Sequence, residues 1–373
     1  MKGNEAIAEA AIRGGCRFFF GYPITPQNEI PEYMSRRLPE VGGVYLQAES
    51  EVAAINMVYG AAAAGARVMT SSSSPGISLK QEGLSYIAAC ELPCVVVNMM
   101  RGGPGLGGIQ PSQSDYFQAT KGGGHGDYHL IVFGPASVQE AADITCEAFS
   151  IADYYRNPVM ILGDGALGQM MEPVEFRPVE EPELPPKTWA TTGARGRRPN
   201  IITSLELEPA LLEELNRRLA AKYEKIKREL VRFDTYKLED AHWAIVAYGM
   251  MARVARAAVD KARARGIRAG LFRPISLFPF PYDSLARVAE QVRAFLTVEM
   301  SMGQMVEDVK LAVLGKRPVH FYGRTGGVVP TAQEILQALE RIIQNEAPQN
   351  ANGAWQKEGD AGAEGFWATG GFN

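Results

Sequence analysis

The sequence predicts an α/β fold, in which a mostly parallel sheet carries helices on both faces and a second, smaller α/β unit follows. Short apolar runs of strand length alternate with longer helical segments through residues 1–175, and the alternation resumes near residue 241. Strands separated by helices of this length pair in parallel, because a helix carries the chain back to the start of the next strand. At 373 residues the chain is long enough for two such units.

Residues 1–175 form the first expected unit. It opens with an amphipathic helix at residues 4–14 that ends at a Gly-Gly pair, and an apolar strand follows at residues 17–21. We expect further helices at residues 51–65, which are rich in alanine, 79–89 and 137–155, and further strands at residues 67–70, 94–100 and 158–162.

A change of composition separates the two units. Residues 175–187 are acidic and rich in proline, which is typical of an extended crossover, and a long charged helix is expected at residues 209–233. The second unit is then expected to have strands at residues 243–248, 268–272, 294–298 and 319–322, with helices at residues 252–265 and 331–345. We therefore divide the chain into domains at residues 1–175 and 241–345, a linker at 176–240 and a flexible tail at 346–373.

Composition excludes several classes of function. The net charge of −4 gives no surface for nucleic acid, and no apolar run approaches the ~20 residues that span a membrane. The N-terminus lacks a basic start followed by an apolar run, and cysteines are sparse, so we expect a cytoplasmic protein. The sequence contains no G-x-S-x-G motif, which would have indicated a hydrolase.

Metal-binding patterns are also lacking. The four cysteines contain no C-x-x-C pair and the four histidines no H-E-x-x-H spacing, so we expect no metal or iron–sulfur cluster in this chain. Cys90 and Cys94 flank Pro93, and a metal shared between them is the alternative interpretation.

Three loops follow expected strands at their carboxyl ends, where open α/β sheets bind ligands. Residues 21–26 place Thr25 between two prolines, which restrict the backbone on either side of its hydroxyl. Residues 47–51 open the alanine-rich helix with two acids, and residues 99–105 place Arg101 ahead of a glycine-rich segment. Each loop also has a simpler interpretation as an ordinary connection.

Glu51 shares one helical face with Ile55, Val58 and Ala62. A carboxyl on an apolar face has a partner or a shifted pKa, because an isolated buried charge is too costly. The alternative is that Glu51, like Glu49, only interacts with the positive end of the helix dipole.

Four motifs in chain order resemble the alpha subunit of 2-oxoacid:ferredoxin oxidoreductases, and most closely the 2-oxoisovalerate (branched-chain) type. These motifs are residues 22–26 (Tyr-Pro-Ile-Thr-Pro), 49–51 (Glu-Ser-Glu), 70–76 (Thr-Ser-Ser-Ser-Ser-Pro-Gly) and 91–101 (Glu-Leu-Pro-Cys to Arg). The resemblance continues through residues 158–162, 272–275 and 299–304, and covers about residues 1–345. It implies a pyrimidine-binding domain for thiamine diphosphate and a second domain like the C-terminal domain of transketolase.

The resemblance also implies roles for single residues. Glu51 matches the glutamate that exchanges a proton with N1′ of the cofactor's aminopyrimidine ring. Thr25 matches a threonine near the substrate carboxylate. Arg101 matches an arginine that binds this carboxylate or positions coenzyme A. The residues implied to bind the cofactor are Tyr22, Pro23, Ile24, Thr25, Glu51, Ser74 and Pro75.

The implied reaction is the oxidative decarboxylation of a 2-oxoacid to acyl-coenzyme A and carbon dioxide, with ferredoxin as the electron acceptor. The family places the diphosphate and Mg²⁺ site on a beta subunit, and [4Fe–4S] clusters on partners that include a gamma and a ferredoxin-like delta subunit. Residues 163–165 (Gly-Asp-Gly) resemble the start of a magnesium–diphosphate motif, but the next asparagine is Asn200, so we interpret them as a turn.

Two other interpretations compete with this one. The first is a subunit of a lipoamide-linked 2-oxoacid dehydrogenase, which has the same pair of domains; residues 22–26 and 101–103 favour the ferredoxin-linked family. The second is a non-catalytic assembly subunit that kept the fold. The presence of Glu51, Thr25 and Arg101 argues against it.

Overall fold

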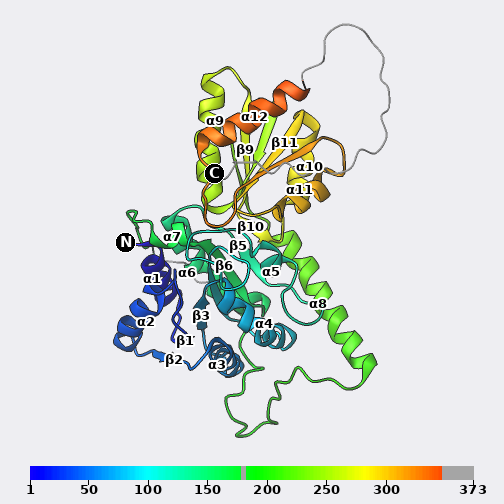
Figure 1. The fold of residues 1–373 in the computed structure, drawn as a ribbon. Coiled ribbons are helices and arrows are strands. Elements are labelled where there is room, and N and C mark those ends of the chain that lie inside the picture. Colours follow the sequence, from blue (N-terminus) through cyan, green and yellow to red (C-terminus); the bar gives the residue numbers. More distant parts are fainter. Residues whose placement is uncertain (178–181, 347–373) are drawn as a thin grey trace.

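The computed structural model describes residues 1–177 and 182–346, which form two sheets flanked by helices (Figure 1). Both sheets are mainly parallel, so the predicted fold class is confirmed. The tail predicted from residue 346 onward lies outside the described residues, apart from Glu346 itself. Among the helices of the described part, none is long and apolar enough to cross a membrane.

The first sheet has seven strands in the order β10-β5-β6-β4-β3-β1-β2. Their bounds are β1 (Phe18–Gly21), β2 (Val44–Gln47), β3 (Val68–Ser72), β4 (Val95–Met100), β5 (Ile131–Phe133), β6 (Val159–Asp164) and β10 (Ser276–Phe278). All pairs are parallel except β10 with β5. Strands β3, β4 and β6 are buried along their whole length, as expected for the centre of a parallel sheet.

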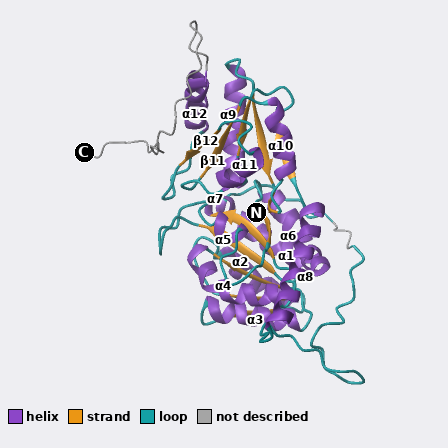
Figure 2. Ribbon diagram, turned by 90° about the vertical axis from the view of Figure 1, so that its right-hand side faces the viewer, coloured by secondary structure: helices purple, strands orange, loops and turns teal. Residues whose placement is uncertain are grey.

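Seven helices accompany the first sheet. They are α1 (Gly3–Arg13), α2 (Glu29–Glu40), α3 (Glu51–Ala63), α4 (Ser74–Ala89), α5 (Tyr116–Thr120), α6 (Val138–Tyr155) and α7 (Gly165–Gln169). Helix α1 packs against α2 and α6, whereas α3 packs against α4, and these two groups flank the strands (Figure 2). Because β1, β3, β4 and β6 are parallel neighbours, their carboxyl ends meet along one edge of the sheet.

A long helix, α8 (Pro209–Glu229), leads to the second sheet and buries Leu219, Tyr223 and Ile226. The helix was expected to continue to residue 233, but Phe233 already begins a strand, β7 (Phe233–Tyr236). Strand β7 pairs with β9 antiparallel, and this sheet pairing competes successfully with helix propensity at the end of α8.

The second sheet has the order β12-β11-β8-β9-β7. Its other strands are β8 (Trp243–Val246), β9 (Ala269–Pro274), β11 (Ala294–Glu299) and β12 (Val319–Gly323), and its helices are α9 (Gly249–Ala264), α10 (Tyr282–Gln291), α11 (Met305–Val313) and α12 (Ala332–Glu346). Buried hydrogen bonds join it to the first part: Gln113 Nε2 donates to the carbonyl of Tyr248, and the Tyr116 hydroxyl donates to Asp308.

Helix α4 begins five positions earlier than the sequence indicated, at Ser74 rather than residue 79. The run of serines around Pro75 is typical of a loop. Proline is nevertheless compatible with the first turn of a helix, because the backbone N–H groups of that turn have no intrahelical acceptor and proline loses no hydrogen bond there. This early start brings Ser74, Pro75 and Gly76 to the carboxyl end of β3, next to the loops expected to bind ligand.

Candidate functional site

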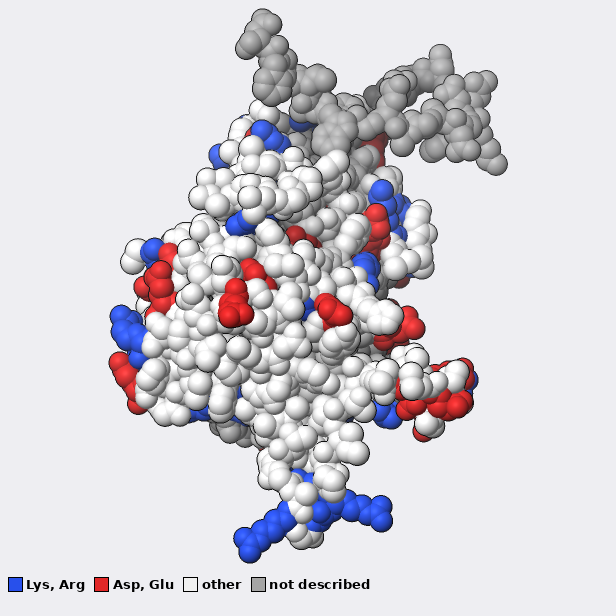
Figure 3. All heavy atoms as spheres, turned by 60° about the horizontal axis from the view of Figure 1, so that its bottom comes forward, with Lys and Arg blue, Asp and Glu red and all other residues white. Residues whose placement is uncertain are grey.

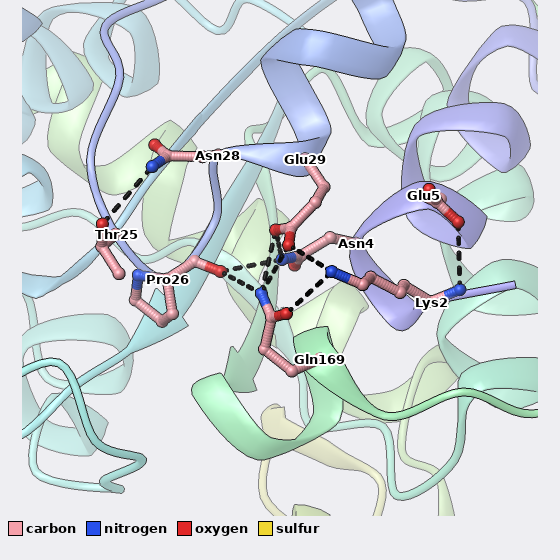
Figure 4. Close-up of polar contacts among 8 residues, drawn as sticks. All are labelled: Lys2, Asn4, Glu5, Thr25, Pro26, Asn28, Glu29 and Gln169. Carbon is pink, nitrogen blue, oxygen red and sulfur yellow. Dashed lines mark hydrogen bonds and ion pairs between the residues drawn. The ribbon is translucent and has the colours of Figure 1, made fainter.

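The loop after β1 is fixed from three helices (Figure 4). Thr25 accepts a hydrogen bond at its hydroxyl from Asn28 Nδ2, 3.3 Å away, and the next peptide bond, to Pro26, is cis. The carbonyl of Pro26 accepts from Asn4 Nδ2 at 2.8 Å and from Gln169 Nε2 at 3.3 Å. Helices α1, α2 and α7 therefore hold Thr25 in one position.

Glu29 joins these helices behind the loop. Its carboxylate accepts hydrogen bonds from Lys2, Asn4 and Gln169 at 2.7 to 2.9 Å. Burial raises the pKa of Glu29, but these hydrogen bonds outweigh it and lower the pKa to about 2. The carboxylate consequently stays ionised and keeps its partners at any physiological pH.

Glu51 begins α3, where Ser50 caps the helix by accepting from the backbone N–H of Ala53 at 3.2 Å. Its side chain is only 6% exposed. A Cβ atom at Gly76 would lie 2.6 Å from Glu51 Oε1 and 2.1 Å from Ser72 Oγ, so only glycine lets α4 approach this carboxyl so closely. We call Glu51, Ser72 and Gly76 the carboxyl cradle.

The carboxyl cradle contains polar atoms without partners. Within residues 1–177 and 182–346 no hydrogen bond or ion pair reaches the Glu51 carboxylate, and the buried hydroxyls of Ser72 and Ser73 also lack partners. Buried polar groups are normally hydrogen-bonded, so their presence together indicates a place where a polar ligand supplies the missing contacts.

Arg101 follows β4 and is 6% exposed. Its guanidinium donates from Nη1 to the carbonyl of Thr25 at 3.0 Å and from Nη2 to the carbonyl of Leu106 at 2.8 Å. The Nε atom is buried without a partner in the described part of the chain. Arg101 therefore links the loop after β1 to the glycine-rich loop of residues 102–110, and its Nε–H is left for an additional acceptor.

A polar network that the sequence did not reveal holds the backbone of Arg101. Its N–H donates to Ser74 Oγ at 3.0 Å, and the Ser74 hydroxyl donates to Asp115 Oδ2 at 2.6 Å. Asn98 donates to the same Asp115 oxygen at 2.9 Å and accepts from the Ser74 N–H at 3.1 Å. Burial raises the pKa of Asp115, against the effect of these two donors. The only signal in the sequence was one asparagine inside the apolar strand β4.

The structure brings most of the predicted residues to one edge of the sheet. Arg101 directly contacts the loop that contains Tyr22, Pro23, Ile24 and Thr25, and it also contacts Ser74. Ser74 and Pro75 form the first turn of α4, beside Gly76 and the carboxyl cradle. Tyr22 and Ile24 are connected to the site through their carbonyl groups, which accept from Gln27.

Residues 163–165 do not form the predicted turn, because Gly163 and Asp164 end β6 and Gly165 already begins α7. Asp164 caps α7 by accepting at Oδ1 from the N–H groups of Ala166 and Leu167, at 2.9 and 3.1 Å. Burial raises the pKa of Asp164 to about 6. In the described ranges no group of three His, Cys, Asp or Glu side chains could hold a metal ion, and Cys90 contacts the Tyr59 hydroxyl at 3.1 Å.

The fold is that of a thiamine diphosphate-binding protein. Residues 9–226 match the family model described as pyruvate flavodoxin/ferredoxin oxidoreductase, thiamine diphosphate-binding, and residues 241–335 match pyruvate:ferredoxin oxidoreductase core domain II. The chain belongs to the 2-oxoacid:ferredoxin oxidoreductase family, so the predicted family, enzyme class and cofactor are confirmed.

Similar proteins include subunits with two different names. The chain is 52% identical to the ketoisovalerate oxidoreductase subunit VorB of Methanothermobacter marburgensis, over 92% of this chain and 97% of that protein. It is 38% identical to the 2-oxoglutarate synthase subunit KorA of Methanothermobacter thermautotrophicus, over 92% and 98% of the two chains. These names make the chain one subunit of a multi-subunit oxidoreductase.

Two solved structures share the fold. A 2-oxoglutarate:ferredoxin oxidoreductase from Magnetococcus marinus, with 2-oxoglutarate, coenzyme A and succinyl-coenzyme A bound, aligns with a TM-score of 0.81 and 29% identity over 92% of this chain, which spans 65% of that longer chain. A split-gene transketolase, in an inactive beta4 tetramer, aligns with a TM-score of 0.60 and 17% identity over 92% and 98% of the two chains, which shows the fold alone.

Proposed function

We propose that this chain is the alpha-type subunit of a ferredoxin-linked enzyme that converts a branched-chain 2-oxoacid, such as 2-oxoisovalerate, and coenzyme A into acyl-coenzyme A and carbon dioxide. The observation that carries the proposal is the carboxyl cradle, where Glu51 is buried without a protein partner beside the loop that carries Arg101. When bound, thiamine diphosphate supplies the nucleophilic carbon and the electron sink for decarboxylation.

Glu51 fits the task of exchanging a proton with N1′ of the aminopyrimidine ring. The carboxyl is shielded from water but not paired with a protein donor, so a ring nitrogen can become its hydrogen-bond partner. The unpartnered hydroxyls of Ser72 and Ser73 offer further polar contacts to the same ring. These features make the residues present a good fit for the pyrimidine half of the cofactor.

Arg101 and Thr25 fit the recognition of the substrate carboxylate. The guanidinium is held by two carbonyl groups, and its Nε–H is left to donate to a further acceptor. A guanidinium is always charged and forms strong hydrogen bonds with carboxylates. The hydroxyl of Thr25 accepts from Asn28 and can therefore donate its own proton to the substrate.

The glycine-rich loop of residues 102–110 supports a substrate with an apolar side chain. It contains no charged residue, and its two apolar side chains, Leu106 and Ile109, are 79% and 57% exposed. The second carboxylate of a substrate such as 2-oxoglutarate needs a cation at this position. A branched alkyl group instead binds more tightly when its apolar surface is buried against leucine and isoleucine. The higher identity to the subunit named ketoisovalerate oxidoreductase agrees with this choice.

A partner is required to complete the site. We propose that a beta subunit binds the diphosphate and Mg²⁺, and that it and further subunits of gamma and ferredoxin-like delta type carry the [4Fe–4S] clusters that pass electrons to ferredoxin. The surface around α3 and α4 has few charged side chains (Figure 3) and exposes Val44, Leu46, Val52, Met57 and Leu79. Exposed apolar surface of this kind suits contact with another subunit.

The assembled complex, purified without oxygen, tests the proposed function. We expect viologen reduction that depends on coenzyme A and is fastest with 2-oxoisovalerate in a panel that includes pyruvate and 2-oxoglutarate. A preparation with intact clusters and bound thiamine diphosphate that reduces viologen with none of these acids would refute the proposal.

A further inference from the structure

Lys80 is a lysine that the fold buries completely. It lies on α4, one turn after Gly76, and none of its surface is exposed. Lysine is almost never fully buried unless its ammonium has partners, because removing the charge from water is costly. The proposed function gives Lys80 no role so far.

The partners of Lys80 lie at the carboxyl end of β3. Its Nζ atom donates to Thr70 Oγ1 at 2.9 Å and to the carbonyl of Ser71 at 3.0 Å. The Ser71 hydroxyl in turn donates to Gln27 Oε1 at 2.5 Å, and Gln27 Nε2 donates to the carbonyl of Tyr22 at 3.4 Å. A buried chain of polar contacts thus connects Lys80 to the loop after β1.

Lys80 also shares a helical face with the carboxyl cradle. Positions 76 and 80 are one turn apart on α4, and Glu51 Oε1 lies against Gly76. Burial lowers the pKa of Lys80 to about 7, and the charge of Glu51 acts in the opposite direction. The two hydrogen-bond acceptors of the Lys80 Nζ atom, the Thr70 hydroxyl and the Ser71 carbonyl, are neutral.

We propose that Lys80 is a positioning residue that stabilises the ionised form of Glu51 and so favours transfer of the shared proton to N1′ of the pyrimidine ring. This inference rests on the proposed function of Glu51. With the cofactor bound, the proton of the Glu51 carboxyl would pass to the ring nitrogen, and Lys80 in its protonated form would supply only its positive charge. A purely structural lysine would leave the titration of Glu51 unchanged.

The Lys80→Met variant removes the charge and keeps the length of the side chain. In the full-length chain without cofactor, infrared spectroscopy follows the carboxyl band that disappears in Glu51→Gln. The pH at which half of this band is lost should be higher by about 1 to 3 pH units in Lys80→Met. This is the range by which a nearby opposite charge shifts the pKa of a carboxyl. An unchanged midpoint in the folded variant would overturn the inference.

Lys222→Met is the matched control. Burial also lowers the pKa of Lys222, to about 8, but its Nζ atom donates to Glu91 and to the carbonyl of Arg156, and no hydrogen bond or ion pair within the described residues joins it to the carboxyl cradle. This variant should leave the Glu51 band unchanged. If it shifts that band as much as Lys80→Met does, the effect is a general one and the assignment to Lys80 fails.

A second measurement does not depend on the folding of Lys80→Met. In a chain with ¹³C at the lysine Cε atoms, Lys80 should titrate near pH 7 and Lys222 near pH 8, and the signal that is lost in Lys222→Met identifies the latter. Because the charge of Glu51 raises the pKa of Lys80, Glu51→Gln should move the Lys80 midpoint lower by about 1 unit or more. If Lys80 has the same titration midpoint in the unaltered chain and in Glu51→Gln, the Lys80 ammonium and the Glu51 carboxyl do not interact. Neither readout requires turnover, so a negative result is distinct from failure of the 2-oxoacid assay.

Discussion

The side chains of Glu51 and Arg101 are both buried, each for a different physical reason. Glu51 is enclosed because Gly76 lets α4 approach without a side chain, and Arg101 is enclosed because two carbonyl groups accept its donors. The helical periodicity of the sequence indicates that Glu51 faces an apolar side of its helix. This periodicity does not place Gly76 or Lys80 near Glu51, because they belong to a different helix and come near it only when α3 and α4 pack together.

Glu51→Gln is the residue-scale test of proton exchange. The amide keeps the size of the carboxyl but cannot take up or release the proton, so we expect turnover of the assembled complex to fall by about 10²- to 10⁴-fold. Glu49→Gln is the matched control, because Glu49 lies two positions away on the exposed surface and should retain normal turnover. Full activity in Glu51→Gln would instead favour a non-catalytic assembly subunit.

At the scale of elements, periodicity is informative for long segments and fails for short or proline-containing ones. Helix α2 (Glu29–Glu40) was not predicted because it contains Pro31 and Pro39, and β5 (Ile131–Phe133) has only three residues. Strand β10 is equally short, and it follows β9 in the chain yet pairs with β5 of the first sheet. Such a pairing depends on tertiary contacts that no local pattern encodes.

The loop of residues 102–110 provides the element-scale test of substrate choice. Leu106→Lys places a cation beside the expected alkyl group, so we predict that kcat/KM falls at least about tenfold for 2-oxoisovalerate and rises relative to it for 2-oxoglutarate. Leu311→Lys is the control, because Leu311 is 55% exposed on α11 and should leave the preference unchanged. An unaltered preference in Leu106→Lys would mean that this loop does not contact the substrate side chain.

At the scale of the whole molecule, the first sheet supplies the site and the second part of the chain supports it. Strand β10 extends the first sheet, and the buried contacts of Gln113 and Tyr116 join the two parts. The carboxyl cradle is where we propose that the pyrimidine ring binds, and the sequence has no convincing magnesium–diphosphate motif. This division is the reason to propose that the cofactor lies between two subunits, each of which makes part of its contacts.

The most direct test of this claim is a calorimetric titration of thiamine diphosphate, with Mg²⁺ present, into the isolated chain and into the assembled complex without cofactor. If the chain supplies only the pyrimidine half, its affinity should be at least about 100-fold weaker than that of the complex, a difference of about 2.7 kcal/mol. Binding to the isolated chain that is as tight as binding to the complex would contradict the account, because it would mean that this chain holds the whole cofactor by itself.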